Sequence, residues 1–120
     1  MKDILTQARL CREAAPTLTC LSAGEKNAAL LELAAALEAH SEDILSANAE
    51  DVAAGRENGM SASLLDRLTL TPARIDAMAE GVRQVAALPD PIGELMEGRT
   101  LPNGLELRQV RVPLGVIGII

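Results

Sequence analysis

The sequence has 120 residues, enough for one domain with a hydrophobic core, and its hydrophobic content is 48%. It contains no Phe, Tyr or Trp, so the core has to consist of smaller aliphatic side chains, which favours closely packed helices. The net charge is −6 and the basic residues are scattered, which argues against a nucleic-acid surface because such a surface needs clustered Lys and Arg.

Targeting and redox signals point to the cytoplasm. The N-terminus lacks the apolar stretch of a signal peptide, and no segment approaches the roughly 18 apolar residues of a membrane span. The spacing of Cys11 and Cys20 fits neither a zinc site nor a redox pair. We therefore expect a cytoplasmic protein with reduced thiols and no membrane partner.

Residues 1–91 are predicted to be helical. A first helix follows the spacing of Ile4, Leu5 and Ala8 and should end at Pro16, because proline lacks the N–H that continues a helix. A second opens at the capping box Ser22–Glu25. The apolar face predicted for this second helix consists of Leu30, Leu33, Ala34 and Leu37.

Three further helices follow. The third begins at Ser41, where two acids suit the positive helix end, and stops at Asn58-Gly59. The fourth runs from Ser61 to Leu68, and the fifth begins with Thr71 as cap and Pro72 at the first helical position. The fifth carries the clearest apolar stripe of the chain, formed by Ile75, Met78, Ala79, Val82, Val85 and Ala86.

After residue 91 the pattern changes to that of β-structure. Leu105–Val112 alternates as a half-buried strand does, the turn 102–104 precedes it, and 94–101 is its antiparallel partner, so 92–113 is predicted to form a hairpin. The unbroken apolar run Val116–Ile120 is typical of a strand buried on both faces of a parallel sheet. Because such a strand needs neighbours, we interpret the chain as the front part of a larger α/β protein. The alternative is a small helical domain with an apolar tail.

The sequence supports no catalytic, cofactor-binding or metal-ligating assignment. His40 is the only histidine and no nucleophile accompanies it, so an exposed residue near a helix end is the better interpretation. Nothing near Cys11 or Cys20 would activate a thiol, and both are interpreted as small hydrophobic residues.

The remaining polar and glycine positions also favour structural roles. Gly115 and Gly118 do not form a phosphate loop and are interpreted as points of close approach. Asn48 lies on the buried side of its helix, where it should hydrogen-bond to a neighbouring loop or helix end. The acidic cluster of the third helix is interpreted as a solvated face and consists of Glu42, Asp43, Glu50, Asp51 and Glu57.

Three stretches together resemble the γ-glutamyl phosphate reductases, a family of the aldehyde dehydrogenase superfamily. The Asp-Arg-Leu-Thr-Leu-Thr and Leu-Pro-Asp-Pro segments in this order are specific to that family, whereas Pro-Leu-Gly-Val alone indicates only the superfamily. The stretches are Asn48–Asp51 leading to Gly55 and Gly59, then Leu65–Ile75 continuing to Glu94, and finally Pro102–Leu105 followed by Arg111–Ile120.

The resemblance implies a fold class and an activity. The fold would be α/β: residues 1–91 are the helical N-terminal part of an NAD(P)-binding domain, 92–113 a hairpin related to oligomerisation, and 114–120 the truncated first strand of the nucleotide-binding sheet. The parent enzyme would use NADPH to reduce L-glutamate 5-phosphate to L-glutamate 5-semialdehyde and phosphate in proline biosynthesis. It would be a homo-oligomer.

The resemblance implies that the catalytic and cofactor-binding residues lie outside this chain. A catalytic cysteine would form a thioester that accepts hydride. Cys11 and Cys20 do not match its position, so this chain would be scaffold and inactive alone. Two alternatives stay open: an aldehyde dehydrogenase homologue with another acyl substrate, and a stand-alone helical interaction module.

Overall fold

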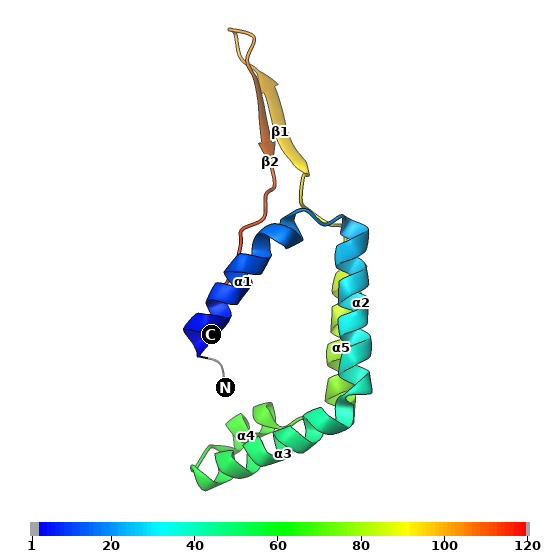
Figure 1. Ribbon diagram of the computed structural model, residues 1–120, viewed down its shortest axis with the longest axis vertical. Helices are drawn as coiled ribbons and strands as arrows, with labels where there is room; N and C mark the ends of the chain where they lie inside the picture. The colour runs from blue at the N-terminus through cyan, green and yellow to red at the C-terminus, as the bar shows by residue number, and fades with distance from the viewer. Residues whose placement is uncertain (1–2, 120) are drawn as a thin grey trace. The chain divides into compact units, whose positions relative to one another are not determined.

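The structure is a computed structural model that describes residues 3–119, and this range contains five helices and one two-stranded antiparallel sheet (Figure 1). Its internal contacts divide the chain into two compact units, one comprising Glu25–Leu88 and the other comprising Met1–Gly24 with Pro89–Ile120. The first helix is thus grouped with the hairpin, whereas the sequence pattern placed it with the other helices in 1–91. The two units are described separately below.

The Glu25–Leu88 unit contains most of α2 (Ala23–Ala39) and all of α3 (Ser41–Glu57), α4 (Ala62–Leu68) and α5 (Pro72–Ala86). The predicted caps are present at two helix starts. The hydroxyl of Ser61 accepts from the N–H of Leu64, and the hydroxyl of Thr71 accepts from the N–H of Arg74 at 3.2 Å. The helix starts predicted from local signals are therefore confirmed.

The end of α3 is a Schellman motif, as the Asn58-Gly59 pair predicts. Gly59 has a φ of 72°, in the left-handed region that favours glycine. Its N–H donates to the carbonyl of Arg56 at 3.1 Å, and the N–H of Met60 donates to the carbonyl of Gly55 at 3.0 Å. Two otherwise unpaired carbonyls of the helix end are thereby satisfied.

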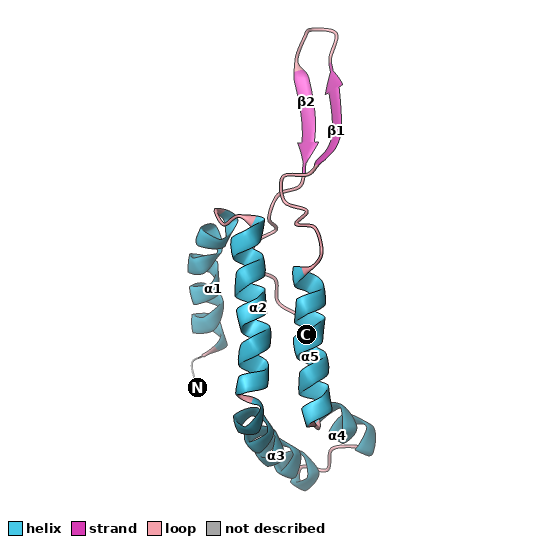
Figure 2. Cartoon of the chain, turned by 90° about the vertical axis from the view of Figure 1, so that its right-hand side faces the viewer, coloured by secondary structure: helices cyan, strands magenta, loops and turns pink. Residues whose placement is uncertain are grey.

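Small side chains dominate the core of this unit. Helices α2 and α5 lie side by side in both views (Figures 1 and 2). Ile75 is the only large side chain among the described residues that is fully buried. Gly55 lets α4 approach α3 closely, since a Cβ at that position would lie 3.3 Å from Leu65. The buried apolar residues are Ala34, Val52, Ile75, Ala79 and Ala86.

The apolar faces of α2 and α5 are only partly covered. Leu33 is 50% exposed and Val85 is 55% exposed, although the pattern places both on the core side. Met78 is also exposed. The helical period finds the correct face of each helix, but the neighbouring helices cover only part of each face.

The other unit begins with α1 (Ile4–Thr19), whose side chains include none that is buried. The prediction that Pro16 ends this helix is wrong. The helix continues through Pro16 to Thr19, and the hydroxyl of Thr19 donates to the carbonyl of Ala15 at 3.1 Å in its last turn. Pro16 therefore removes one backbone hydrogen bond to the preceding turn without ending the helix.

The predicted hairpin is confirmed. Strand β1 (Leu95–Thr100) pairs antiparallel with β2 (Glu106–Val110), with a bulge between Leu95 and Glu97. Backbone hydrogen bonds continue the pairing at its base, where Arg111 also contacts the Glu94 carboxylate at 2.8 Å. Both strands are exposed throughout, so the predicted half-buried character is wrong for this chain. No further layer among residues 3–119 covers either face of the two-stranded sheet.

The apolar run at the end of the chain forms no strand in the described part, residues 116–119, and Ile120 lies outside it. Ile117 and Ile119 are exposed. A strand requires a backbone partner, and the only sheet in the described range consists of β1 and β2. The prediction of a buried strand in a parallel sheet therefore stays a prediction.

Candidate functional site

The most specific polar contact of the chain is made by Asn48 on α3. Its side-chain amide donates to the carbonyl of Leu68 at 2.9 Å, and its side-chain oxygen accepts from the N–H of Leu70 at 2.7 Å. One amide thus satisfies a donor and an acceptor of the backbone between α4 and α5, where no helix can pair them. The sequence predicted such a contact to a loop or helix end, and the structure identifies its partners.

Arg74 also contacts the connection between α4 and α5. Its guanidinium donates to the carbonyl of Asp66, to the carbonyl of Thr69 at 2.5 Å and to the carboxylate of Asp66 at 3.0 Å. The hydroxyl of Thr69 donates to the carbonyl of Leu65 at 2.7 Å. Asn48 and Arg74 together therefore fix the backbone of the Leu68–Leu70 turn, which is a structural and not a chemical task.

Helices α2 and α5 are joined by an ion pair between Glu38 and Arg83. The guanidinium lies 2.6 Å from the carboxylate, and both side chains are partly exposed. The hydrogen bond from Arg83 lowers the pKa of Glu38 and raises the pKa of Arg83. No sequence signal predicts this contact, because the two residues lie 45 positions apart.

The Glu38–Arg83 pair predicts a pH-dependent stability difference. A carboxyl whose pKa is lowered on folding stabilises the folded state above its unfolded pKa, and this contribution disappears as the pH falls through the folded pKa. We expect Glu38→Gln to lower the unfolding midpoint in denaturant at neutral pH, and the difference from the unmodified chain to vanish in acid. Glu42→Gln, an exposed acid on α3, is the control. A difference that persists unchanged in acid would contradict the assignment.

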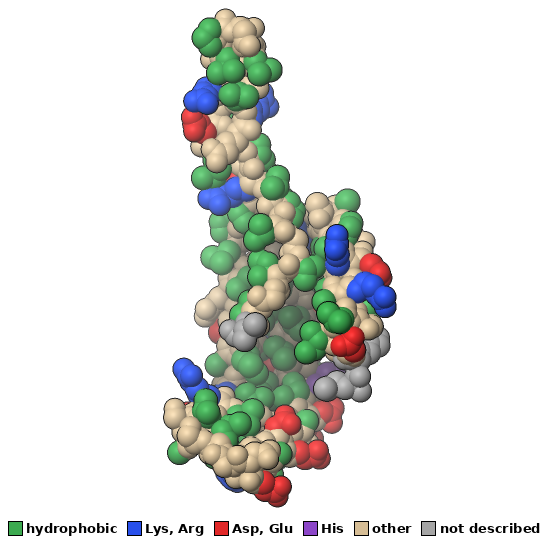
Figure 3. All heavy atoms as spheres, turned by 90° about the vertical axis from the view of Figure 1, so that its left-hand side faces the viewer, with side chains coloured by type: hydrophobic (Ala, Val, Ile, Leu, Met, Phe, Trp, Pro, Cys, Tyr) green, Lys and Arg blue, Asp and Glu red, His purple; other side chains and the backbone are tan. Residues whose placement is uncertain are grey.

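His40 and the acidic residues of α3 do not assemble into a chemical site. His40 lies at the start of α3 with Nδ1 3.5 Å from the Asp43 carboxylate, and both side chains are exposed. The acidic side chains of α3 face solvent, and in Figure 3 red side chains gather at the end of the view where α3 lies. Within residues 3–119 no group of His, Cys, Asp and Glu is placed to hold a metal ion.

Cys11 lines an open hollow of about 740 Å³ between α1 and residues 114–118. Both cysteines are free and exposed, so neither Cys11 nor Cys20, interpreted as small hydrophobic residues, is buried in this chain. Nothing lies within 4 Å of a Cβ built at Gly115 or Gly118, which contradicts the predicted close approach. The φ of 98° at Gly115 explains the glycine there instead.

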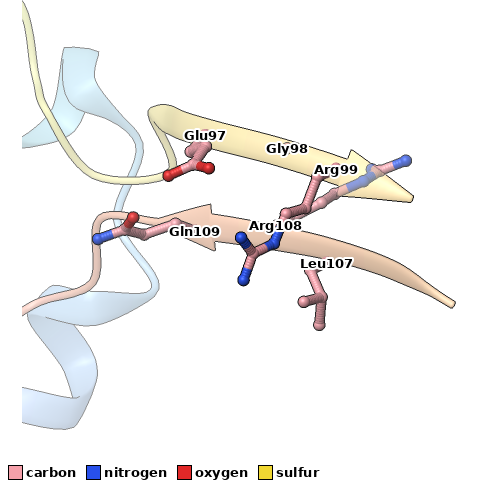
Figure 4. A pocket seen from close by; sticks show the side chains of 6 residues that line it. All are labelled: Glu97, Gly98, Arg99, Leu107, Arg108 and Gln109. Carbon is pink, nitrogen blue, oxygen red and sulfur yellow. The ribbon is translucent and has the colours of Figure 1, made fainter. Parts of the chain in front are cut away.

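A second hollow, of about 230 Å³, lies on the hairpin (Figure 4). It is lined by Glu97, Gly98 and Arg99 of β1 and by Leu107, Arg108 and Gln109 of β2. Figure 4 shows these side chains spreading outward from the two strands rather than converging on one point. Arg108 contacts Glu106 of its own strand at 3.2 Å. The hollow is therefore open surface, and its charges are partly paired.

Comparison with known proteins shows what this chain is similar to. No family model matches the chain. It is 56% identical over 119 residues to the γ-glutamyl phosphate reductase of Thermobifida fusca (strain YX), covering 99% of this chain and 28% of the relative. It is 52% identical over 120 residues to the enzyme of the same name from Geobacillus sp. (strain WCH70), covering 100% of this chain and 29% of the relative.

Solved structures of γ-glutamyl phosphate reductase share the fold. The crystal structure from Thermotoga maritima matches with a TM-score of 0.84 and 38% identity, over 93% of this chain and 27% of that chain. The structure from Saccharomyces cerevisiae matches with a TM-score of 0.81 and 34% identity, over 94% of this chain and 29% of that chain.

These matches indicate first a fold class and then the particular protein that the chain resembles. The five helices and the hairpin are consistent with the N-terminal part of an aldehyde-dehydrogenase-like fold. The chain corresponds over its whole length to part of γ-glutamyl phosphate reductase, and it spans less than a third of the relatives that it matches. The resemblance seen in the sequence motifs is thereby confirmed.

Proposed function

We propose that this chain is a scaffold part of an enzyme that reduces L-glutamate 5-phosphate to L-glutamate 5-semialdehyde and phosphate, a step of proline biosynthesis. The observation that carries the proposal is the identity of 56% over 119 residues with a protein named for that reaction. The 119 matched residues span the connection held by Asn48 and Arg74 as well as the hairpin. The same helices and hairpin in solved reductase structures give further support.

The proposed reductant is NADPH, and we assign its binding site to residues outside this chain. A Rossmann-type dinucleotide site uses a glycine-rich turn that opens a helix, so that the helix N-terminus faces the pyrophosphate. Gly115 and Gly118 do not have the spacing of such a turn, and Gly104 closes a hairpin turn. The proposal assigns cofactor binding and chemistry to the rest of the enzyme.

The helices and the hairpin would have structural roles in the enzyme. We propose that the hairpin 92–113 contributes to self-association of the longer protein, since its two strands leave both edges and both faces exposed. The location proposed for the enzyme is the cytoplasm, where the exposed Cys11 and Cys20 stay reduced. No helix within residues 3–119 is long and apolar enough to cross a membrane.

The isolated 120-residue chain is expected to show no NADPH-dependent reductase activity. The assay supplies glutamate 5-semialdehyde, phosphate and NADP⁺ and follows NADPH fluorescence, which measures the reaction in reverse. The longer protein that contains this chain is the positive control and is expected to turn over. Turnover by the isolated chain would overturn the scaffold assignment.

The same assay distinguishes the proposed enzyme from an aldehyde dehydrogenase homologue that acts on another acyl substrate. If the longer protein reduces other acyl phosphates or thioesters but not glutamyl phosphate, it is an aldehyde dehydrogenase homologue of different specificity. Loss of turnover when phosphate is omitted from the reverse reaction is the result expected for the proposed enzyme, because phosphate is then a substrate.

A further inference from the structure

The chain contains two Asn-Gly pairs, Asn58-Gly59 and Asn103-Gly104, in two different structural settings. Glycine lacks a Cβ, so its backbone nitrogen can approach the side-chain carbonyl of the preceding asparagine with less steric hindrance than in any other pair. We propose that Asn103 is a site of spontaneous deamidation in the folded chain and that Asn58 is protected from it.

The reaction needs no reactant besides water. The backbone nitrogen of Gly104 attacks the side-chain carbonyl carbon of Asn103, the C–N bond of the side-chain amide breaks, and ammonia leaves with the proton of the attacking amide. Water then opens the five-membered succinimide at either of its two carbonyls. One opening produces aspartate and the other isoaspartate, with no change of oxidation state.

The hairpin turn places the side-chain carbonyl of Asn103, which is the group attacked, along the backbone that follows it. The side-chain oxygen of Asn103 accepts from the N–H of Leu105 at 3.1 Å, so the amide lies along the backbone that follows it and its carbonyl is polarised. The N–H of Gly104 donates to the carbonyl of Leu101 at 2.8 Å, and this one hydrogen bond has to open before attack. The surrounding strands are exposed on both faces, and a two-stranded hairpin is only marginally stable by itself.

The surroundings of Asn58 disfavour the corresponding attack by the nitrogen of Gly59. The N–H of Gly59 is engaged in the Schellman motif, where Met60 also donates to Gly55. Gly55 is buried against α4, so opening this helix end disturbs packing as well as hydrogen bonds. Local opening is costlier where backbone is tied to a core than at an exposed loop tip. The attacking nitrogen of Gly59 is therefore less available than that of Gly104.

Deamidation at Asn103 changes the hairpin in two ways. Either product adds a negative charge beside the turn. Isoaspartate also lengthens the main chain by one carbon between residues 103 and 104, which separates the Gly104 N–H from the Leu101 carbonyl that it contacts. The modification therefore weakens the closure of β1 on β2 without touching the helical unit Glu25–Leu88.

The experiment incubates the whole 120-residue chain in mildly alkaline buffer and measures deamidation at both sites by peptide mass spectrometry over time. We expect Asn103 to deamidate roughly tenfold faster than Asn58, a ratio that corresponds to about 1.4 kcal/mol of difference in opening free energy. In concentrated urea the two rates should become similar, because both asparagines then precede glycine in an unfolded chain.

Two matched variants complete the test. Gly104→Ala should suppress deamidation at Asn103 and leave Asn58 unchanged, whether or not the hairpin still forms, because the added Cβ hinders the attacking nitrogen. Gly59→Ala should leave the rate at Asn103 unchanged. Equal rates at the two sites without urea, or a faster rate at Asn58, would overturn the proposal.

Discussion

Truncating Ile75 to Ala is expected to lower the free energy of unfolding by about 2 to 5 kcal/mol, the usual loss for a large aliphatic side chain removed from a core. Ile75 is fully buried, and the side chains buried with it are mostly alanines that cannot move to fill the space. The measurement is urea denaturation followed by circular dichroism. Loss of the transition altogether would agree with the prediction, because domain stability is typically only about 5 to 15 kcal/mol.

The control for Ile75 lies on the same helix. Val85→Ala removes an aliphatic side chain that is more than half exposed, so its effect is expected to stay within about 0.5 kcal/mol. Similar losses for the two variants would mean that Ile75 is not the centre of this core.

Replacing Asn48 by Ala is expected to cost about 2 kcal/mol. The change removes two hydrogen bonds and leaves the carbonyl of Leu68 and the N–H of Leu70 without their partner in a partly buried turn. The readout is again the unfolding free energy. Ser46→Ala, at an exposed position of α3, is the control and should be close to neutral.

Asn48→Asp tests the direction of the two hydrogen bonds. A carboxylate can still accept from Leu70 but cannot donate to Leu68, and it places a negative oxygen beside that carbonyl. We expect this variant to be at least as unstable as Asn48→Ala at neutral pH and to recover part of the loss in acid, where the protonated carboxyl can donate. Stability equal to that of the unmodified chain at neutral pH would contradict the observed geometry.

Much of the secondary structure was predictable because helix caps and turns depend on hydrogen bonds and backbone conformations within a few residues. Ser61, Thr71 and Pro72 mark helix starts through the hydrogen bonds of the first turn, and Gly59 marks a helix end through its backbone conformation. Pro16 was misleading because a proline removes one hydrogen bond to the preceding turn but does not prevent the residues after it from being helical. The hairpin was predictable because its turn and its alternation both act over a few residues.

The candidate site was predictable only in part. That Asn48 needs a partner follows from its place on a buried face, but Leu68 and Leu70 could be identified only once α4 and α5 were placed. Arg74 carried no signal, since an arginine near a helix start is common and its contacts lie in the preceding connection. Exposure of Cys11 was missed because the hollow beside it depends on how residues 114–118 run.

The sequence by itself determined the helix boundaries set by caps and glycine, the hairpin, and the correspondence to γ-glutamyl phosphate reductase. These depend on residue order and on hydrogen bonds between near neighbours. Only the tertiary structure decided which apolar side chains are buried, which backbone groups Asn48 satisfies, and which acid Arg83 contacts. Burial and long-range pairing depend on what a neighbouring element covers, and no periodicity in one segment contains that information.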